Sequence, residues 1–230
     1  MKNIYSDFTK FSLDSGIPSM NLDQYSKYMS TVINPTILEE RKLNVAQMDV
    51  FSRLLYDNII FIGDSIDREL ANIIQAQLLY LSNAHPDTDI SIYINSGGGI
   101  VSDGLAIYDT MQIVSPDIAT ICTGEAASMA AVLLSAGTKG KRSILPHSEV
   151  MIHQPSGGMR GQVSDLSIHF KTLQRCKTVL YNILSLHTGQ SIKKITKDAD
   201  RDYWMTANEA ISYGIVDKII TKKQKIVKGD

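Results

Sequence analysis

The segment Gly124-Glu125-Ala126-Ala127-Ser128-Met129-Ala130 joins two apolar stretches and decides how the surrounding chain folds. Residues 118–123 before it are typical of a buried strand, and residues 129–135 after it are typical of a helix. Ser128 is therefore expected at a turn from strand to helix, close to the very small side chains of Ala126, Ala127 and Ala130. A hydroxyl at such a turn is open to a substrate, and the next amide lies at a helix N-terminus, where negative charge is favoured.

Ser128 alone does not establish a catalytic site. Ala126 and Ala130 occupy the places of the two glycines in Gly-x-Ser-x-Gly, so the nucleophile elbow of the α/β-hydrolases is not matched. A serine in this position can also simply cap the following helix. The segment by itself leaves the catalytic and the capping interpretation open.

The composition is that of one globular domain. The chain has 230 residues, of which 43% are hydrophobic and 20% charged, enough for a substantial core. The formal net charge of −1 gives no electrostatic reason to expect nucleic acid as a partner. No apolar stretch approaches the length of a membrane span, so we expect no membrane partner either.

The two cysteines, Cys122 and Cys176, indicate neither a disulfide framework nor a metal site. Neither belongs to a Cys-x-x-Cys or His/Cys spacing of the kind that binds zinc. Cys122 lies inside an apolar strand and is expected to be buried. This cysteine usage fits a reducing compartment, and the N-terminus has no apolar signal segment, so we expect a cytoplasmic protein.

Strands and helices are expected to alternate, which predicts an α/β fold with mainly parallel strands. The expected strands are residues 59–63, 90–94, 118–123, 150–152 and 215–220. The expected helices are residues 49–56, 67–81, 100–114, 129–135, 162–186, a short helix after Ser191, and 206–213. We predict a polar N-terminal extension over residues 1–45, one domain over 46–222 and a basic tail over 223–230.

A serine nucleophile needs a base to accept its proton, and the base needs an acid to orient it. Of the five histidines, His153 is the best candidate, because it ends an apolar strand and precedes a loop rich in Pro and Gly. In open α/β folds such strand ends line the ligand crevice.

Residues 197–204 offer three aspartates for the acid. Asp202 is preferred, because Tyr203 and Trp204 directly after it are expected to draw it toward the core. The alternative is that the whole acidic run is only a helix end followed by a turn.

The three glycines Gly97, Gly98 and Gly99 follow a strand and precede a helix. Glycine lets a backbone amide approach a ligand closely, as the donors of an oxyanion hole must. The segment matches neither a phosphate-binding loop nor a dinucleotide fingerprint, so a nucleotide site is a weak alternative.

Several segments together closely resemble the proteolytic subunits of Clp protease, the ClpP family. The resemblance runs from about residue 46 to 220. Its motifs are Tyr93-Ile-Asn-Ser-Gly-Gly-Gly99, Ile107-Tyr-Asp-Thr-Met-Gln112, Thr120-Ile-Cys-Thr-Gly-Glu-Ala-Ala-Ser-Met129, Ala136-Gly-Thr-Lys-Gly-Lys-Arg142, Val150-Met-Ile-His-Gln-Pro155, His187-Thr-Gly-Gln190 and Asp200-Arg-Asp202.

The resemblance implies a serine endopeptidase. Ser128 would be the nucleophile, His153 the general base and Asp202 the orienting acid, and the backbone amides of Gly99 and Met129 would form the oxyanion hole. All three triad positions carry the residue types of the family, so an active subunit is expected, with no cofactor of its own.

The resemblance also implies a crotonase-like spiral of βαβ units with a protruding handle. Two stacked heptameric rings would enclose the active sites, with Asp200 and Arg201 linking the ring contact to the order of the triad. Unfolded polypeptides would be cut to short peptides after delivery by an AAA+ unfoldase of the ClpX, ClpA or ClpC type, and only that partner would use ATP.

Two features depart from the family pattern. Gly97 stands where the family usually has Pro, which should loosen the loop that carries Gly99, and the N-terminal extension is longer than the usual propeptide. Two other functions remain as alternatives: a crotonase-like acyl-CoA enzyme, which would not need the triad, and a structural ring subunit that depends on an active paralogue.

Overall fold

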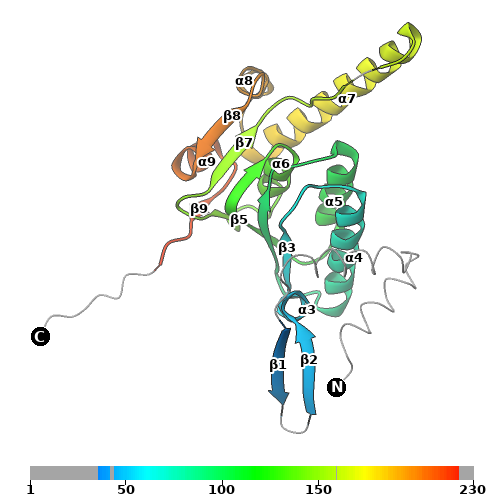
Figure 1. The fold of residues 1–230 in the computed structure, drawn as a ribbon. Coiled ribbons are helices and arrows are strands. Elements are labelled where there is room, and N and C mark those ends of the chain that lie inside the picture. Colours follow the sequence, from blue (N-terminus) through cyan, green and yellow to red (C-terminus); the bar gives the residue numbers. More distant parts are fainter. Residues whose placement is uncertain (1–35, 42–43, 159, 223–230) are drawn as a thin grey trace, which may run out of the picture.

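The computed structural model describes residues 36–41, 44–158 and 160–222, and the elements are labelled as in Figure 1. The strands are β1 (Thr36–Arg41), β2 (Asn44–Asp49), β3 (Ile59–Ile62), β4 (Ile90–Ser96), β5 (Ile118–Ala127), β6 (Arg142–Ile144), β7 (Glu149–Ile152), β8 (Tyr203–Thr206) and β9 (Lys218–Ile219). The helices are α3 (Val50–Tyr56), α4 (Arg68–Ala84), α5 (Val101–Ile113), α6 (Met129–Ser135), α7 (Val163–Thr188), α8 (Ile192–Asp198) and α9 (Ala207–Tyr213). The predicted basic tail and most of the predicted extension lie outside the described residues.

Strand β5 is the centre of the fold, because its two halves belong to different parts of the sheet. Residues 120–122 pair in parallel with β6, and residues 125–127 pair in parallel with β7. Between these halves Gly124 has φ 125°, a conformation that favours glycine and lets the strand turn from one partner to the other. On its other side β5 pairs with β4, and β4 pairs with β3, both in parallel. The prediction of an α/β fold with mainly parallel strands is confirmed.

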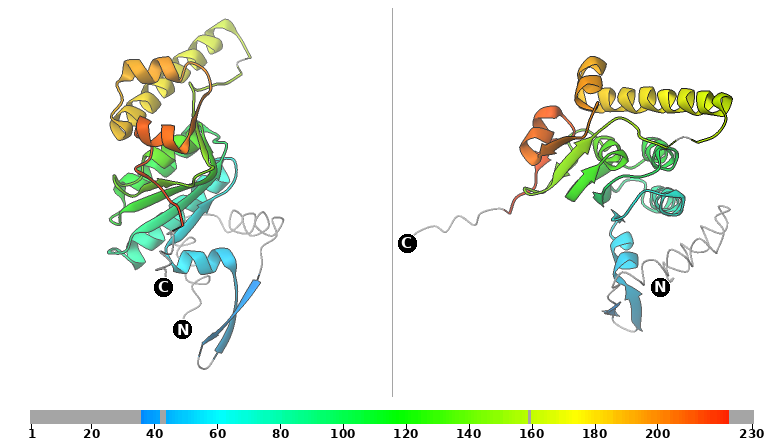
Figure 2. Two further views of the ribbon diagram at one scale, coloured as in Figure 1. Left: turned by 90° about the vertical axis from the view of Figure 1, so that its left-hand side faces the viewer. Right: turned by 45° about the horizontal axis from the view of Figure 1, so that its top comes forward.

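Helices α4 and α5 lie side by side on one face of this sheet, and α6 follows them toward the base of α7 (Figures 1 and 2). The strands present a continuous row of isoleucines to these helices, including Ile60, Ile62, Ile92 and Ile94, none of which is more than 1% exposed. The helix ends follow sequence signals: the Asp67 side chain caps α4 by accepting from the Leu70 amide, and the Ser191 side chain caps α8 by accepting from the Lys194 amide.

The sequence did not predict every boundary correctly. Strand β5 continues to Ala127 rather than ending at residue 123, since residues 125–127 pair with β7. Strands β6 and β8 were not predicted, because runs of three and four residues are too short for a periodic signal. The expected last strand, residues 215–220, is reduced to Lys218–Ile219.

The β1–β2 hairpin was not predicted either. Its strands pair antiparallel from Thr36↔Asp49 to Arg41↔Asn44, and it projects from the body of the protein next to α3 (Figure 1). The predicted boundary at residue 45 falls inside β2. The division into an extension and a domain stays a prediction.

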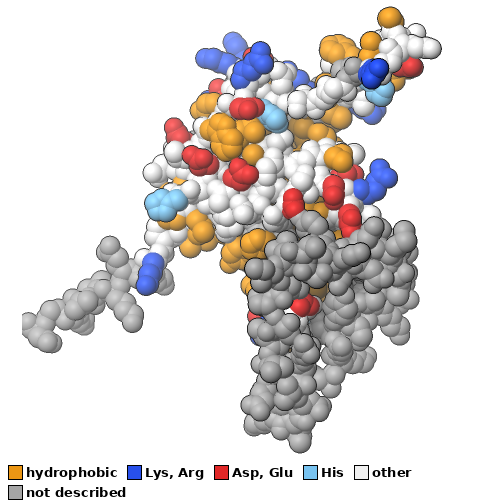
Figure 3. All heavy atoms as spheres, viewed as in Figure 1, with side chains coloured by type: hydrophobic (Ala, Val, Ile, Leu, Met, Phe, Trp, Pro, Cys, Tyr) orange, Lys and Arg blue, Asp and Glu red, His pale blue; other side chains and the backbone are white. Residues whose placement is uncertain are grey.

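Helix α7 projects away from the domain, as the handle of the sequence prediction requires (Figures 1 and 2). Its buried residues lie near its C-terminal end: Leu180, Tyr181, Ile183 and Leu184. Its projecting half carries apolar side chains in contact with solvent, as Figure 3 shows, and Val163, Ile168 and Phe170 are 83%, 63% and 53% exposed. Such an apolar surface is larger than a monomer needs to cover its own core.

Candidate active site

Ser128 lies at the junction of β5 and α6 in a backbone conformation that side chains rarely adopt, with φ 55° and ψ −120°. Its own hydrogen bonds hold it there: its amide donates to the Met151 carbonyl (2.8 Å), and its carbonyl accepts from the Ala131 amide (3.1 Å). Such a conformation costs on the order of 1–3 kcal/mol and persists only where the surroundings impose it. The Ser128 side chain makes no capping hydrogen bond to α6, so the capping interpretation is wrong.

His153 follows directly after β7 and reaches Ser128 because β7 runs parallel to the second half of β5. The register pairs Ala127 with Met151, so that the two strands end together at the same edge of the sheet. His153 Nε2 lies 2.8 Å from Ser128 Oγ. The His153 side chain is 23% exposed, so part of the ring is accessible from solvent.

Asp202 reaches His153 through the antiparallel pairing of β7 with β8. The last pair of the ladder is Ile152↔Tyr203, and one further step places Asp202 opposite His153. Asp202 Oδ1 lies 3.0 Å from His153 Nδ1. The stated reason for preferring Asp202 was wrong, because Tyr203 and Trp204 are 37% and 47% exposed and draw nothing into the core.

The order of contacts defines a direction for proton transfer. A carboxylate only accepts, so the Nδ1–H of His153 donates to Asp202, and Nε2 is left as the acceptor for the Ser128 hydroxyl. This is the arrangement of a serine nucleophile, its general base and the acid that fixes the base's tautomer.

The glycine loop lies directly against Ser128. A Cβ on Gly98, which has φ 95°, would come within 2.8 Å of Ser128 Cβ and 2.9 Å of the Met129 amide nitrogen. Gly99 forms a parallel bridge with Ile66 in which the Gly98 carbonyl accepts from the Ile66 amide and the Ile100 amide donates to the Ile66 carbonyl. In such a bridge the amide of Gly99 itself points away from Ile66.

Gly97 differs from its two neighbours. It has no positive φ, and a Cβ there would meet only the Glu125 carboxylate, at 3.5 Å. The backbone therefore does not require glycine at this position. Whether the loop is looser than one with Pro stays a prediction.

A small apolar pocket of about 60 Å³ opens next to Ser128 and His153. Val101 from α5, Val132 from α6, and Leu180 and Leu184 from α7 line its wall, together with Met129 and Ile152. Of these residues only Met129 was expected at the site, and for its backbone amide rather than its side chain. The signal was present only as helical spacing, which is the same for any core residue.

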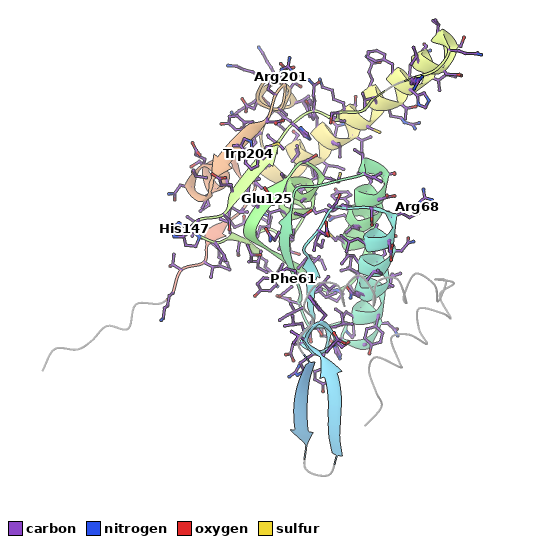
Figure 4. All side chains as sticks on the ribbon, in the orientation of Figure 1. Phe61, Arg68, Glu125, His147, Arg201 and Trp204 are labelled. Carbon is purple, nitrogen blue, oxygen red and sulfur yellow. The ribbon has the colours of Figure 1, made fainter. Side chains whose placement is uncertain are left out.

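The remaining predicted residues lie at the surface. Asp200 and Arg201 are exposed, and Figure 4 shows Arg201 and Trp204 at the edge where α8 and β8 lie.

Cys122 is buried as expected, and burial raises the pKa of its thiol to about 12. In the ranges that the structure describes, no three His, Cys, Asp or Glu side chains are arranged to hold a metal ion. Within those ranges, too, no helix combines the length and apolar character needed to cross a bilayer.

Fold and site together define a serine peptidase on a spiral of βαβ units. A sequence model of the Clp protease family matches residues 41–223, and the chain belongs to this family. It is 59% identical to an ATP-dependent Clp protease proteolytic subunit of Porphyromonas gingivalis over 96% of this chain and 100% of that protein. It is 58% identical to a protein of the same name from Bacteroides fragilis, over 94% of this chain and 99% of the other.

Proposed function

We propose that this chain is the proteolytic subunit of an ATP-dependent Clp protease, with Ser128 as nucleophile, His153 as general base and Asp202 as orienting acid. The observation that carries the assignment is the continuous contact from Asp202 through His153 to a strained Ser128, at 3.0 and 2.8 Å. A crotonase-like acyl-CoA enzyme would not need this contact, and a purely structural subunit would not need the strain.

The reaction follows from the geometry. His153 Nε2 takes the proton of Ser128 as Oγ attacks the peptide carbonyl, and Asp202 stabilises the imidazolium that forms. The developing oxyanion is held by the amides of Gly99 and of Met129, the first residue of α6, which has no acceptor within its own helix. His153 then returns the proton to the leaving amine, and water releases the acyl group by the same steps.

The pocket beside Ser128 gives the substrate preference. Its wall of Val, Leu, Ile and Met side chains favours an apolar residue before the cleaved bond, since a charged side chain would lose its hydration there. The site has no cofactor in this proposal.

The assembly we propose is two stacked heptameric rings that meet through α7. The exposed Val163, Ile168 and Phe170 on its projecting half provide the apolar contact, and the exposed Asp200 and Arg201 pair with the facing ring. Enclosure of the sites lets the protease work in the cytoplasm, where an AAA+ unfoldase of the ClpX, ClpA or ClpC type delivers unfolded substrates and hydrolyses ATP. Both cysteines being free is consistent with that compartment.

The decisive experiment is labelling with a fluorophosphonate, which reacts only with an activated serine. Wild-type protein should be labelled on Ser128 and should cleave a short peptide with an apolar residue before the cleaved bond. Ser128→Ala should lose both, with turnover lower by about 10⁶-fold if the triad acts as a unit. Labelling at another residue, or peptide cleavage by Ser128→Ala, would refute the assignment.

The assembly is tested separately. Mass by light scattering should correspond to fourteen subunits, as two heptameric rings require. A tagged folded substrate should be degraded only when the unfoldase and ATP are both present. An active monomer would contradict the enclosed assembly without affecting the role of Ser128.

A further inference from the structure

The side chain of Asp202 makes few contacts that would fix its position. The Asp202 side chain is 62% exposed, and among the described residues its carboxylate has a single hydrogen-bond partner, His153. An exposed carboxylate with one contact keeps much of its rotamer freedom. The backbone of the loop that carries it, residues 199–202, must therefore decide where Asp202 stands.

Gln154 connects this loop to the histidine. It directly follows His153, and its side-chain Nε2 donates to the Asp200 carbonyl at 2.9 Å, two residues before Asp202. The same amide accepts through Oε1 from Lys177 Nζ, also at 2.9 Å. Because a lysine ammonium only donates, Oε1 must face Lys177, and the NH₂ group must then face the carbonyl. Both contacts require the same orientation of the amide.

The second anchor of the loop comes from the same face of α7. Tyr181 lies one turn after Lys177, and its hydroxyl donates to the Ala199 carbonyl at 3.3 Å. Lys177 Nζ also lies 5.4 Å from the centre of the Tyr181 ring. Burial and, second, the negative charge of Asp200 raise the pKa of the Tyr181 hydroxyl, which keeps it a donor.

We propose that Gln154, oriented by Lys177, is a positioning residue that holds the loop of Asp202 at hydrogen-bond distance from His153. The inference rests on the proposed function, because it needs Asp202 to act on His153. It adds a role for two residues that touch neither Ser128 nor the apolar pocket: Gln154 does not line that pocket, although its neighbours His153 and Pro155 do.

The test compares variants of Gln154 by the rate of Ser128 labelling with a fluorophosphonate and by peptide turnover. Gln154→Ala should lower both the labelling rate and kcat about tenfold, the equivalent of about 1.4 kcal/mol or one net hydrogen bond. KM should stay within about twofold, since the substrate pocket is intact. Gln154→Glu, which keeps the length but places a carboxylate against the Asp200 carbonyl, should lose at least as much.

Lysine variants separate orientation from packing. Lys177→Met keeps most of the aliphatic stem but removes the donor, and should lower the labelling rate about threefold. Lys177→Arg keeps a donor and should stay within about twofold of wild type. Equal losses in the two variants would contradict the role assigned to the lysine hydrogen bond.

Gln190→Ala is the matched control. Gln190 Nε2 also donates to a backbone carbonyl at 2.9 Å, that of Tyr213, far from Ser128 in the chain. Its loss should lower the thermal midpoint without changing the labelling rate. Trp204, the single tryptophan of the chain, gives a further readout, because it lies two residues after Asp202. Its emission should change in Gln154→Ala and not in Gln190→Ala.

A double mutant decides whether Gln154 acts through Asp202. In an Asp202→Asn background Gln154→Ala should add less than about twofold, because the acid that it positions is already lost. A full tenfold further loss there, or wild-type labelling by Gln154→Ala, would overturn this inference while leaving Ser128→Ala inactive. If Ser128→Ala still cleaved peptides, the proposed function would fail first and this inference with it.

Discussion

Gly98 is a position outside the triad where the addition of a single methyl group should damage catalysis. Its φ is 95°, and a Cβ there would lie 2.6 Å from the Ala127 carbonyl oxygen, 2.8 Å from Ser128 Cβ and 2.9 Å from the Met129 amide nitrogen. All three atoms belong to the backbone turn that carries the nucleophile, or are fixed to it. Gly98→Ala therefore cannot be relieved by the rotation of a flexible side chain.

Two effects add in this variant. The positive φ costs alanine about 1–2 kcal/mol of stability. The clash, several tenths of an ångström or more, must move the glycine loop away from Ser128 and with it the Gly99 amide. Since a shift of about 1 Å in a reacting group can cost about 10²-fold, we expect kcat to fall by about that factor.

Gly140→Ala is the control, because Gly140 has φ 88° and open space around it within 4 Å. Gly140→Ala should lose about 1–2 kcal/mol of stability, which is the cost of the positive φ alone, and should keep the kcat of the wild type. Denaturation by urea and peptide turnover, measured on both variants, separate the two effects. Wild-type kcat in Gly98→Ala, or an equal loss of kcat in Gly140→Ala, would refute the reasoning.

Three other predictions concern single side chains. Asp202→Asn should lower turnover about 10⁴-fold by favouring the wrong tautomer of the base, whereas Asp198→Asn, whose carboxylate contacts Lys194 and Tyr213 instead, should leave turnover near wild type. Because burial raises the pKa of Cys122 to about 12, its thiol should resist iodoacetamide in the folded protein and react after unfolding, as counted by mass spectrometry. Burial acts to raise the pKa of Asp217, but the hydrogen bonds and charge of Arg142 outweigh it and lower the pKa. The stability from this pair should be present above the unfolded pKa and lost as pH falls through the folded one, so Asp217→Asn should flatten acid unfolding below about pH 4.

Most of the fold could be predicted from periodicity. The alternation of apolar strands with amphipathic helices predicted the parallel core, and the strand-end positions of Ser128 and His153 followed from it. Periodicity could not predict the double pairing of β5, since residues 124–127, Gly-Glu-Ala-Ala, show no alternation of apolar and polar side chains. The strand β8 was missed because its four residues are too few for a periodic signal.

The acid and its support were harder to predict. Asp202 lies against His153, but the physical reason given for its place was wrong: the β7–β8 register brings it there, not the burial of its aromatic neighbours. In the sequence, 23 residues separate Gln154 from Lys177, and another 23 separate Lys177 from Asp200. Only the packing of α7 brings the three residues together. No local pattern in the sequence marks such a contact.

The β7–β8 ladder also determines which changes the gene can tolerate. His153 and Asp202 are neighbours because each lies one step beyond the pair Ile152↔Tyr203. Most substitutions at exposed ladder positions leave that step unchanged, but insertion or deletion of one codon within β7 would turn His153 to the opposite face of the sheet. The described residues of the glycine-rich segment, 156–158 and 160–161, by contrast, lie between the site and α7 and outside any strand or helix. Over evolution, this segment can vary in length, whereas β7 beside it can vary only in its side chains.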